Sequence, residues 1–450
     1  MSHAPVRHRV AALVAGLVTV VSGLVTAAPA QAVNKAGNIA TPGNFTGYGF
    51  DQCLAPNQAA MDAWLRSSPF WAVGIYISGD SRACPSQPNL TPTWVSTQLA
   101  NGWRLLPITL GPQAWCTSRD RYKQQVRISP SPAGGYAAAL AQGRAEADKS
   151  VQSAAALGLA AGSTLWYDLE GDFSTSRTDC RESALTFLSG WTTRLHELGF
   201  VSGFYSSAGT GIKMLDDAAS LRPGTFAMPD QLWVARWSGT PNRINEPGVT
   251  YVRDTSWASH QRVHQYRGGH NETHGGVTIN IDSNYLDLGT GSVARSAKSF
   301  CGGVGIDYPV YAKLRKGSEG DQVKAAQCLL RMKKKYDGDI TGVYDRATRQ
   351  AAKAYRVKMG FPARGVMSKA VWTSIHSKGR HPLMKYGATG HAVRRLQRAL
   401  NAADRARLNV SGVFEATTTA AVKKYQADNK MPATGVVTEA TWAQLRKGNR

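Results

Sequence analysis

The chain has 450 residues, of which 42% are hydrophobic and 18% are charged, so a disordered chain and a single ordinary domain are both excluded. Its 53 lysines and arginines against 30 aspartates and glutamates give a formal net charge of +23. This charge excludes a neutral surface and predicts an acidic partner, for which nucleic acid, membrane and anionic cell wall all qualify.

Residues 1–32 have the pattern of a secretory signal peptide. A basic start that includes Arg7 and Arg9 precedes an apolar stretch over 10–27, and two small-x-small cleavage sites follow within 28–32. A membrane anchor is the alternative, but the glycines in the apolar stretch and the cleavage sites disfavour it. No later stretch reaches the roughly 18 apolar residues that a membrane span needs. We therefore expect a secreted protein, extracellular or associated with the cell wall, for which nucleic acid is not a partner.

After a linker at 33–47, residues 48–288 alternate β-rich runs with helical runs. Eight strands in such a segment predict an α/β fold, a (β/α)₈ TIM-like barrel. The expected strands are Tyr48–Asp51, Ala72–Ile77, Arg104–Thr109, Thr164–Glu170, Val201–Ser206, Leu232–Trp237, Val263–Tyr266 and Thr278–Asp282. The expected helices between the early strands are Asn57–Arg66, Pro92–Asn101, Tyr136–Leu157 and Arg181–Leu198.

Four carboxylates fall at the ends of three expected strands. Asp51 ends the first strand, Asp168 and Glu170 end the fourth, and Asp282 ends the eighth. Chemistry in such barrels sits at the carboxyl ends of the strands, and closure makes the eighth strand a neighbour of the first. Any one of these aspartates by itself is explained as a turn cap. Four together predict a catalytic cluster in which some carboxyls hold protons and others are ionised, as acid–base cleavage of glycosides requires.

Aromatic and amide side chains are expected at the same ends, where rings stack on sugars and amides bind hydroxyl groups. The candidate substrate-binding residues are Tyr76, Gln113, Trp115, Tyr167, Tyr205, Trp237, Gln265, Tyr266 and Tyr285. The long loop over 111–135 carries four cations, Arg119, Arg121, Lys123 and Arg127. It is equally explained as a lid or glycan subsite and as a solvated excursion.

The chain has six cysteines, a number that fits disulfides in an oxidising compartment. Cys301 and Cys328 lie far from the others in sequence and are expected to pair. The other four admit three connectivities. Pairing neighbours would join the loops around the barrel mouth as Cys53–Cys84 and Cys116–Cys180.

Other chemistries find little support in the sequence. The segment from His270 to His274 is not the H-E-x-x-H of zinc proteases and lies in a glycine-rich connection, so no metal is expected. Ser206 and Ser207 lack the G-x-S-x-G context of a serine hydrolase. No glycine-rich phosphate loop is present, and no cofactor is expected.

The last third of the chain is basic and repetitive, and follows a low-complexity linker at 289–308. Residues 301–450 hold 29 lysines and arginines against 10 acids, whereas residues 31–300 hold 22 against 20. Two copies with a period of 70 residues occupy 309–379 and 380–450. The helices expected in the two copies are Val323–Met332, Thr348–Met359 and a short helix around Trp372, and then Ala392–Ala402, Thr417–Asn429 and a short helix around Trp442.

The repeats resemble the peptidoglycan-binding domain common in secreted bacterial hydrolases. The resemblance rests on the Gly-x-x-Gly start, the V-x-x-x-Q helix, the G-x-[FY] turn and the closing G-V with its tryptophan, in both copies. The first copy departs from the pattern at Arg356, where the second has Gln426. Two linked modules imply stronger wall retention. The basic surface implies attraction to peptide-stem carboxylates or wall phosphates that salt weakens.

The barrel segment resembles the glycoside-hydrolase-like domain of secreted actinobacterial proteins (domain of unknown function 1906), which is related to family 25 lysozymes. The matching motifs are Gly49-Phe-Asp51, Tyr167-Asp-Leu-Glu170, His264-Gln-Tyr266 and Ile281-Asp-Ser-Asn284. The resemblance implies that Glu170 is the general acid and that Asp168 stabilises positive charge or orients an acetamido group. It also implies that Asp51 and Asp282 position substrate and tune pKa values.

Together these patterns predict a secreted, muramidase-like hydrolase that cleaves a β-1,4 bond of peptidoglycan after N-acetylmuramic acid. The expected partner is peptidoglycan or a related wall glycan, and the mature chain is expected to be monomeric without a membrane span. One alternative is a non-catalytic protein that binds wall or glycan with the same cleft. Another is chitinase-like hydrolysis of a different N-acetylated polysaccharide.

Overall fold

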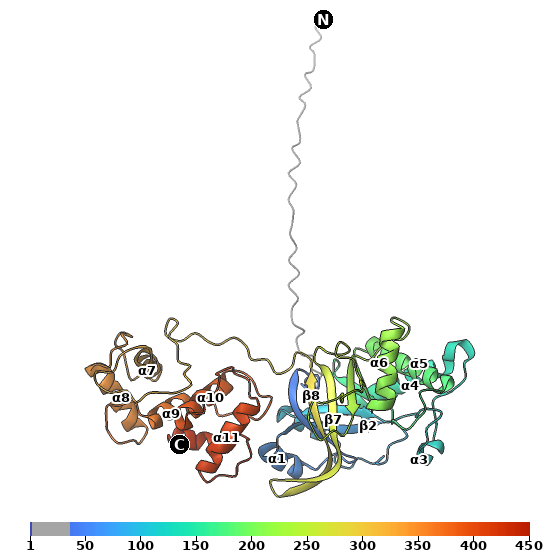
Figure 1. Cartoon of the computed structure of the whole chain (residues 1–450), viewed down its shortest axis with the longest axis horizontal. Helices are drawn as coiled ribbons and strands as arrows, with labels where there is room; N and C mark the ends of the chain where they lie inside the picture. The colour runs from blue at the N-terminus through green and yellow to red at the C-terminus, as the bar shows by residue number, and fades with distance from the viewer. Residues whose placement is uncertain (2–36) are drawn as a thin grey trace. The chain divides into compact units, whose positions relative to one another are not determined.

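The computed structural model describes Met1 and residues 37–450 (Figure 1). The expected signal peptide therefore lies, apart from Met1, outside the described residues, as does the start of the expected linker at 33–47. None of the helices within 37–450 combines the length and the hydropathy that crossing a membrane requires.

Eight strands close into a barrel in chain order, which confirms the predicted architecture. Their bounds are β1 Phe45–Asp51, β2 Phe70–Ser78, β3 Arg104–Thr109, β4 Thr164–Asp168, β5 Val201–Ser207, β6 Gln231–Ala235, β7 Gln261–His274 and β8 Val277–Leu288. Strands β1 to β7 pair in parallel as sequential neighbours. Every strand lies within a few residues of its expected position except the last two, which are much longer.

The last two strands differ from a regular (β/α)₈ barrel because they form a hairpin. Gly275 and Gly276 both have positive φ and make the tight turn between them. Strand β8 consequently runs antiparallel to both β7 (Figure 1) and β1. Asp282 lies inside this strand. The expectation that Asp282 ends a parallel strand is therefore wrong. It reaches the same rim as Asp51 because the two residues are register partners in the β1–β8 pair.

Helices cover the outside of the barrel. They are α1 Gln58–Ser67, α2 Pro92–Ala100, α3 Asp120–Lys123, α4 Ala133–Ala156, α5 Thr178–Glu197, the π-helix Ala208–Ile212 and α6 Lys213–Leu221. Helices α4 and α5 pack closely (Figure 1), because glycines face the partner backbone. A Cβ at Gly143 would lie 2.0 Å from the Phe187 carbonyl oxygen, and one at Gly190 would lie 2.3 Å from that of Leu140.

Two apolar layers hold the barrel together. Inward-facing side chains such as Trp166 and Trp233, whose rings meet edge to face with centroids 5.5 Å apart, fill the interior. Outward-facing strand residues pack against the helices. Residues before β1 belong to this structure, because Thr41 is buried and its hydroxyl donates to the Leu105 carbonyl at 2.9 Å. The segment before Tyr48 is thus only partly a linker.

The two C-terminal repeats fold as three helices each, as expected. Their bounds are α7 Asp321–Met332, α8 Arg346–Lys358 and α9 Lys369–Ser377 in the first, and α10 His391–Asp404, α11 Ala416–Asp428 and α12 Glu439–Arg446 in the second. Each has its own core, to which Ile306, from the end of the expected linker, contributes in the first repeat. Buried Gln327 and Gln397 explain the repeated glutamine, since each accepts at 3.0 Å from the amide of the glycine in the following turn.

Residues 37–450 form one compact unit. Within it the second repeat contacts the barrel through Lys385, which is 1% exposed. Its ammonium group donates to the carbonyls of Ser68 at 2.9 Å and Phe70 at 2.8 Å. Burial lowers the pKa of Lys385 well below its usual value. Lys385 therefore supplies hydrogen-bond donors to two backbone carbonyls between the end of α1 and the start of β2.

Candidate active site

The four predicted carboxylates converge at one rim of the barrel. Asp51 ends β1 opposite Asp282, Asp168 ends β4, and Glu170 follows two residues later. A cavity of about 210 Å³ is lined by Asp51, Glu170 and Asp282 together with Tyr76. Asp168 lies just beneath it and is 1% exposed. The expected cluster is therefore present, with three members on the cavity wall and one buried behind them.

A network of amides holds Asp51 and Asp282. The Asn284 amide donates to Asp51 at 2.6 Å, and the Gln265 amide donates to Asp51 at 3.2 Å and to Asp282 at 3.4 Å. Asn284 is itself oriented by the Trp233 indole N–H, which donates to its oxygen at 2.7 Å. Asp51 and Asp282 thus accept hydrogen bonds from the same Gln265 amide, so the two carboxylates lie close together.

Asp168 and Glu170 are positioned by a side chain from β2 and by one from the loop after β3. The Tyr76 hydroxyl on β2 donates to Asp168 at 3.3 Å. The Gln113 side chain accepts from the Glu170 amide at 2.8 Å and donates to the Asp168 carbonyl at 2.8 Å, so it clamps the backbone of both acids. The other Asp168 carboxylate oxygen is buried without a hydrogen-bond partner among the described residues.

The long loop over 111–135 reaches the site through Arg119 and Tyr122. The Arg119 guanidinium lies 3.1 Å from one Glu170 oxygen and also pairs with Asp172, while the Tyr122 hydroxyl donates to the other Glu170 oxygen at 3.3 Å. Tyr122 is 1% exposed, so the loop is anchored. This part of the loop therefore covers the acid, whereas Arg119, Asp120 and Arg121 beside Tyr122 are exposed. The loop thus combines features of both alternatives, a lid and a solvated excursion.

Burial governs the electrostatics of the cluster. The pKa of Asp51 is raised to about 8, mainly by burial and then by the negative charge of Asp282. The hydrogen bonds from Asn284 and Gln265 lower this pKa but do not offset the rise. Burial and then the charge of Glu170 raise the pKa of Asp168 well above its usual value. Burial also raises the pKa of Asp282, although the Gly269 amide opposes this. At neutral pH Asp51 therefore favours its protonated form, and burial shifts the pKa values of Asp168 and Asp282 in the same direction.

Of the nine aromatic and amide candidates, Tyr76 is the one that lines the cavity. Tyr76, Tyr205 and Gln265 lie at the inner rim, where the Tyr205 hydroxyl and the Trp237 indole both donate to Gln265. Trp237 is 69% exposed at the rim and free to contact a ligand. Gln113 instead binds the backbone of Asp168 and Glu170.

The remaining four candidates make contacts outside the carboxylate cluster. Tyr167 is fully buried against Phe187 and α5 and donates to the Pro112 carbonyl at 2.6 Å, so it belongs to the core. Tyr285 faces outward beside Tyr48, Tyr266 faces outward near His264, and Trp115 packs under Arg127. The outward members alternate with inward neighbours, because successive strand side chains face opposite sides.

Asn284 and Tyr122 are site residues that the sequence did not single out. Asn284 stood within a matching motif, two residues after Asp282, and that spacing on a strand places both on one face. Arg119 was noted only as one of four loop cations. Nothing in the sequence distinguishes it from Arg121, which instead contacts the Ser81 carbonyl.

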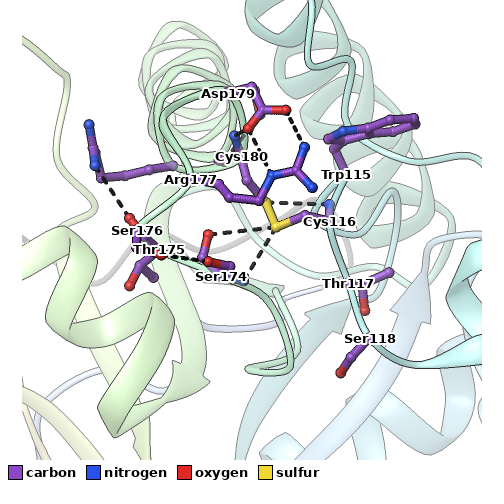
Figure 2. Close-up of a disulfide and its surroundings, with 12 residues drawn as sticks. Trp115, Cys116, Thr117, Ser118, Ser174, Thr175, Ser176, Arg177, Asp179 and Cys180 are labelled. Carbon is purple, nitrogen blue, oxygen red and sulfur yellow. Dashed lines mark hydrogen bonds and ion pairs between the residues drawn. A yellow bond between two sulfur atoms is a disulfide. The ribbon is translucent and has the colours of Figure 1, made fainter.

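All three disulfides of the described chain join the predicted neighbours. They are Cys53–Cys84, Cys116–Cys180 and Cys301–Cys328. Figure 2 shows Cys116–Cys180 beside the ion pair of Arg177 and Asp179. This bridge ties the start of the Arg119 loop to the first turn of α5. The Ser118 amide adds a second tie by donating to the Asp172 carbonyl at 2.7 Å.

The histidines of the β7–β8 hairpin contact a carboxylate between them. His270 and His274 lie 3.0 Å and 2.9 Å from the two oxygens of Glu272. No group of three or more possible metal ligands gathers anywhere in residues 37–450. The histidine pair is accounted for by these contacts.

Two family models match the chain. The model described as the Rv2525c-like, glycoside hydrolase-like domain matches residues 62–286, half of the chain. The chain therefore belongs to this family of glycoside-hydrolase-like barrels. A peptidoglycan binding domain model matches residues 389–445, which lie in the second repeat. No match was found among proteins with curated functions.

Several solved structures are similar to the barrel. An uncharacterised protein of B. stearothermophilus is 17% identical, with a TM-score of 0.35 over 53% of this chain and 95% of its own. The Tat-secreted protein Rv2525c of Mycobacterium tuberculosis, solved with HEPES, is 15% identical, with a TM-score of 0.35 over 54% and 96%. A family 25 glycosyl hydrolase of Bacillus anthracis is 11% identical, with a TM-score of 0.31 over 58% and 94%.

Proposed function

We propose that this protein is a secreted, monomeric hydrolase of cell-wall glycan. In this proposal a barrel over 48–288 cleaves a β-1,4 bond of peptidoglycan, and modules over 309–379 and 380–450 hold it on the wall. The observation that carries the proposal is the convergence of Asp51, Asp168, Glu170 and Asp282 at one barrel rim, in a chain that also contains a peptidoglycan-binding domain. Paired carboxyls with different environments are the machinery of glycoside hydrolysis.

The environments of the four carboxyls suggest their roles. Glu170 lines the cavity and is only partly buried, so in the proposal it donates a proton to the glycosidic oxygen. Asp168 is buried with a raised pKa, and as a neutral group it would orient an acetamido oxygen by donating a hydrogen bond. Asp51, whose pKa is about 8, and Asp282 would position sugar hydroxyls.

The cavity must widen before a polymer enters. Its volume of about 210 Å³ is below the roughly 300–1,000 Å³ of ordinary ligand sites. Tyr122 and Arg121 of the covering loop line it. In the proposal this loop moves aside and the Arg119–Glu170 ion pair opens when wall glycan binds, which gives Glu170 access to the bond.

The test uses purified peptidoglycan, with released reducing ends and retention on insoluble wall measured in parallel. Glu170→Gln should abolish release and keep retention, since the amide has the same shape but cannot donate as an acid. Asp172→Asn is the matched control, because Asp172 also pairs with Arg119 but does not line the cavity. Equal release by Glu170→Gln and the unchanged protein would contradict the assignment. Products ending in N-acetylmuramic acid would identify a muramidase, and cleavage of chitin oligomers alone a chitinase-like enzyme.

One observation favours a second candidate, a non-catalytic wall-binding protein. The ion pair with Arg119 and the small cavity together leave Glu170 occupied in the described structure. Full retention of the unchanged protein on wall with no reducing ends at any pH would establish this alternative.

A further inference from the structure

The two C-terminal repeats contain the same surface groove. Ten residues line a groove of about 650 Å³ in the first repeat. The ten residues exactly one period of 70 later all line a groove of about 740 Å³ in the second, where barrel residues including His274 form a further wall. The groove is therefore a property of the repeat fold, and the two copies differ in their side chains and in the barrel wall that only the second groove has.

The first groove is lined by six cations. They are Arg315, Lys316, Arg346, Arg349, Lys353 and Arg364. The corresponding residues of the second groove are Lys385, Tyr386, Ala416, Thr419, Lys423 and Thr434. Since Lys385 is buried against barrel carbonyls, Lys423 is the cation that remains at the second groove.

Total charge does not explain this difference. The first repeat has 16 lysines and arginines against 5 acids, and the second has 13 against 4, so the two are similarly basic. None of the six groove cations forms an ion pair with a carboxylate in residues 37–450, and all six are exposed. In the first repeat, six cations therefore line one groove, and no carboxylate of the described residues neutralises them.

The fold does not require these cations. Arg346, Arg349 and Lys353 recur at spacings of three and four on one face of α8, where like charges repel and weaken a helix. The second repeat builds the equivalent helix with Ala416 and Thr419 at the first two positions. An arrangement that costs stability and has a neutral alternative in the same chain indicates binding of an anion.

One of the groove arginines packs against the opposite wall of the groove. The Arg349 stem lies so close to Gly365 on the opposite wall that an added Cβ there would meet its Cγ at 2.3 Å. Below it, Arg356 is buried and donates to the Pro362 carbonyl at 2.8 Å, where the second repeat has Gln426 bound to Gly435. The loop that carries Arg364 is thus braced differently in the two copies.

We infer that the groove of the first repeat binds a phosphodiester-linked anionic polymer of the cell wall. A guanidinium matches phosphate oxygens with two parallel hydrogen bonds, and a row of cations matches a regularly repeating anion. A peptide stem offers separate carboxylates among neutral groups and leaves most of the six cations unmatched. The inference rests on the proposed function only for the location of the protein at a wall.

The experiment measures binding of fluorescent poly(glycerol phosphate) to the full chain by anisotropy, over a range of salt. The test variant combines Arg346→Ala, Arg349→Thr and Arg364→Thr, which are residues that the second repeat already has at these positions. The control variant removes the same charge elsewhere in the repeat through Lys313→Ala, Lys334→Asn and Lys369→Ala. Poly(glutamate) of matched length supplies a carboxylate polymer.

The test variant should bind poly(glycerol phosphate) at least about tenfold more weakly, and the slope of log affinity against log salt should fall by about two to three. The control variant should stay within about twofold of the unchanged chain. Equal weakening by both variants, or equal affinity for poly(glutamate), would overturn the inference. Because no bond is cleaved, an inactive barrel would not affect the result, and loss of this binding would leave glycan hydrolysis by the barrel intact.

Discussion

The guanidinium of Arg119 lies 3.1 Å from a carboxylate oxygen of Glu170, and the same arginine pairs with Asp172. The arginine comes from a loop some fifty residues before the acid in sequence, and a disulfide near its start holds that loop against α5. A movement of the covering loop would therefore also break the ion pair between Arg119 and Glu170.

Replacement of Arg119 should increase hydrolysis near neutral pH. In the proposed mechanism the ion pair between Arg119 and Glu170 must open before Glu170 can contact the glycosidic oxygen, so removal of the guanidinium favours the open form. Because the pair is partly exposed, we expect Arg119→Gln to raise the rate of reducing-end release by no more than about fivefold. Arg127→Gln is the control, because Arg127 lies over Trp115 away from the acids. A rate that falls with Arg119→Gln would show that the arginine binds substrate.

The buried Asp51 should make the barrel less stable as the pH rises. Its pKa is about 8 in the folded chain, so between its unfolded value and pH 8 the folded state holds the extra proton. Its contribution to the free energy of unfolding is thus complete below about pH 4 and is lost as the pH rises through 8, by up to about 1.4 kcal/mol per pH unit. Asp51→Asn removes this dependence.

Thermal unfolding at pH 5 and pH 8 tests this expectation. The melting temperature of Asp51→Asn relative to the unchanged protein should be higher at pH 8 than at pH 5. Asp254→Asn, at an exposed aspartate, should show no such difference. A constant difference across this range would mean that Asp51 is ionised in the folded protein.

Loss of the Cys116–Cys180 bridge should destabilise the barrel and free the covering loop. The bridge closes 64 residues, which corresponds to about 4 kcal/mol of unfolding free energy in the chain-entropy model. We expect Cys116→Ser with Cys180→Ala to lower the barrel melting temperature by about 10 °C. Cys301→Ala with Cys328→Ala, in the first repeat, should leave the barrel transition in place. An unchanged barrel transition in the first variant would contradict the expectation.

Deletion of residues 301–450 should remove most salt-sensitive binding to insoluble wall. The segment before it is nearly neutral, whereas the deleted part holds 29 lysines and arginines against 10 acids. Removal of Lys385 returns the carbonyls of Ser68 and Phe70 to water, so we expect the barrel to stay folded by circular dichroism. Wall binding by residues 31–300 with the salt dependence of the full chain would disprove this division of labour.

The sequence by itself determined the number and approximate place of the strands, the 70-residue repeat and the four carboxylates. These features depend only on residues close together in the sequence, because apolar side chains alternate along a strand and recur every three or four residues along a helix. The number of cysteines by itself allows three pairings of the four barrel cysteines. The order of the strands favours the pairing of neighbours, because it places the loops that carry them side by side.

The tertiary structure alone decided which way the last strand runs and which loop reaches which acid. Asp282 meets Asp51 because a glycine turn reverses β8, and that reversal depends on pairing with β1, more than 230 residues away. Tyr167 is a core residue and Arg119 a contact of Glu170 for the same reason: each depends on surfaces assembled from distant segments. Burial, which raises the pKa of Asp51, likewise arises only when the barrel closes around it.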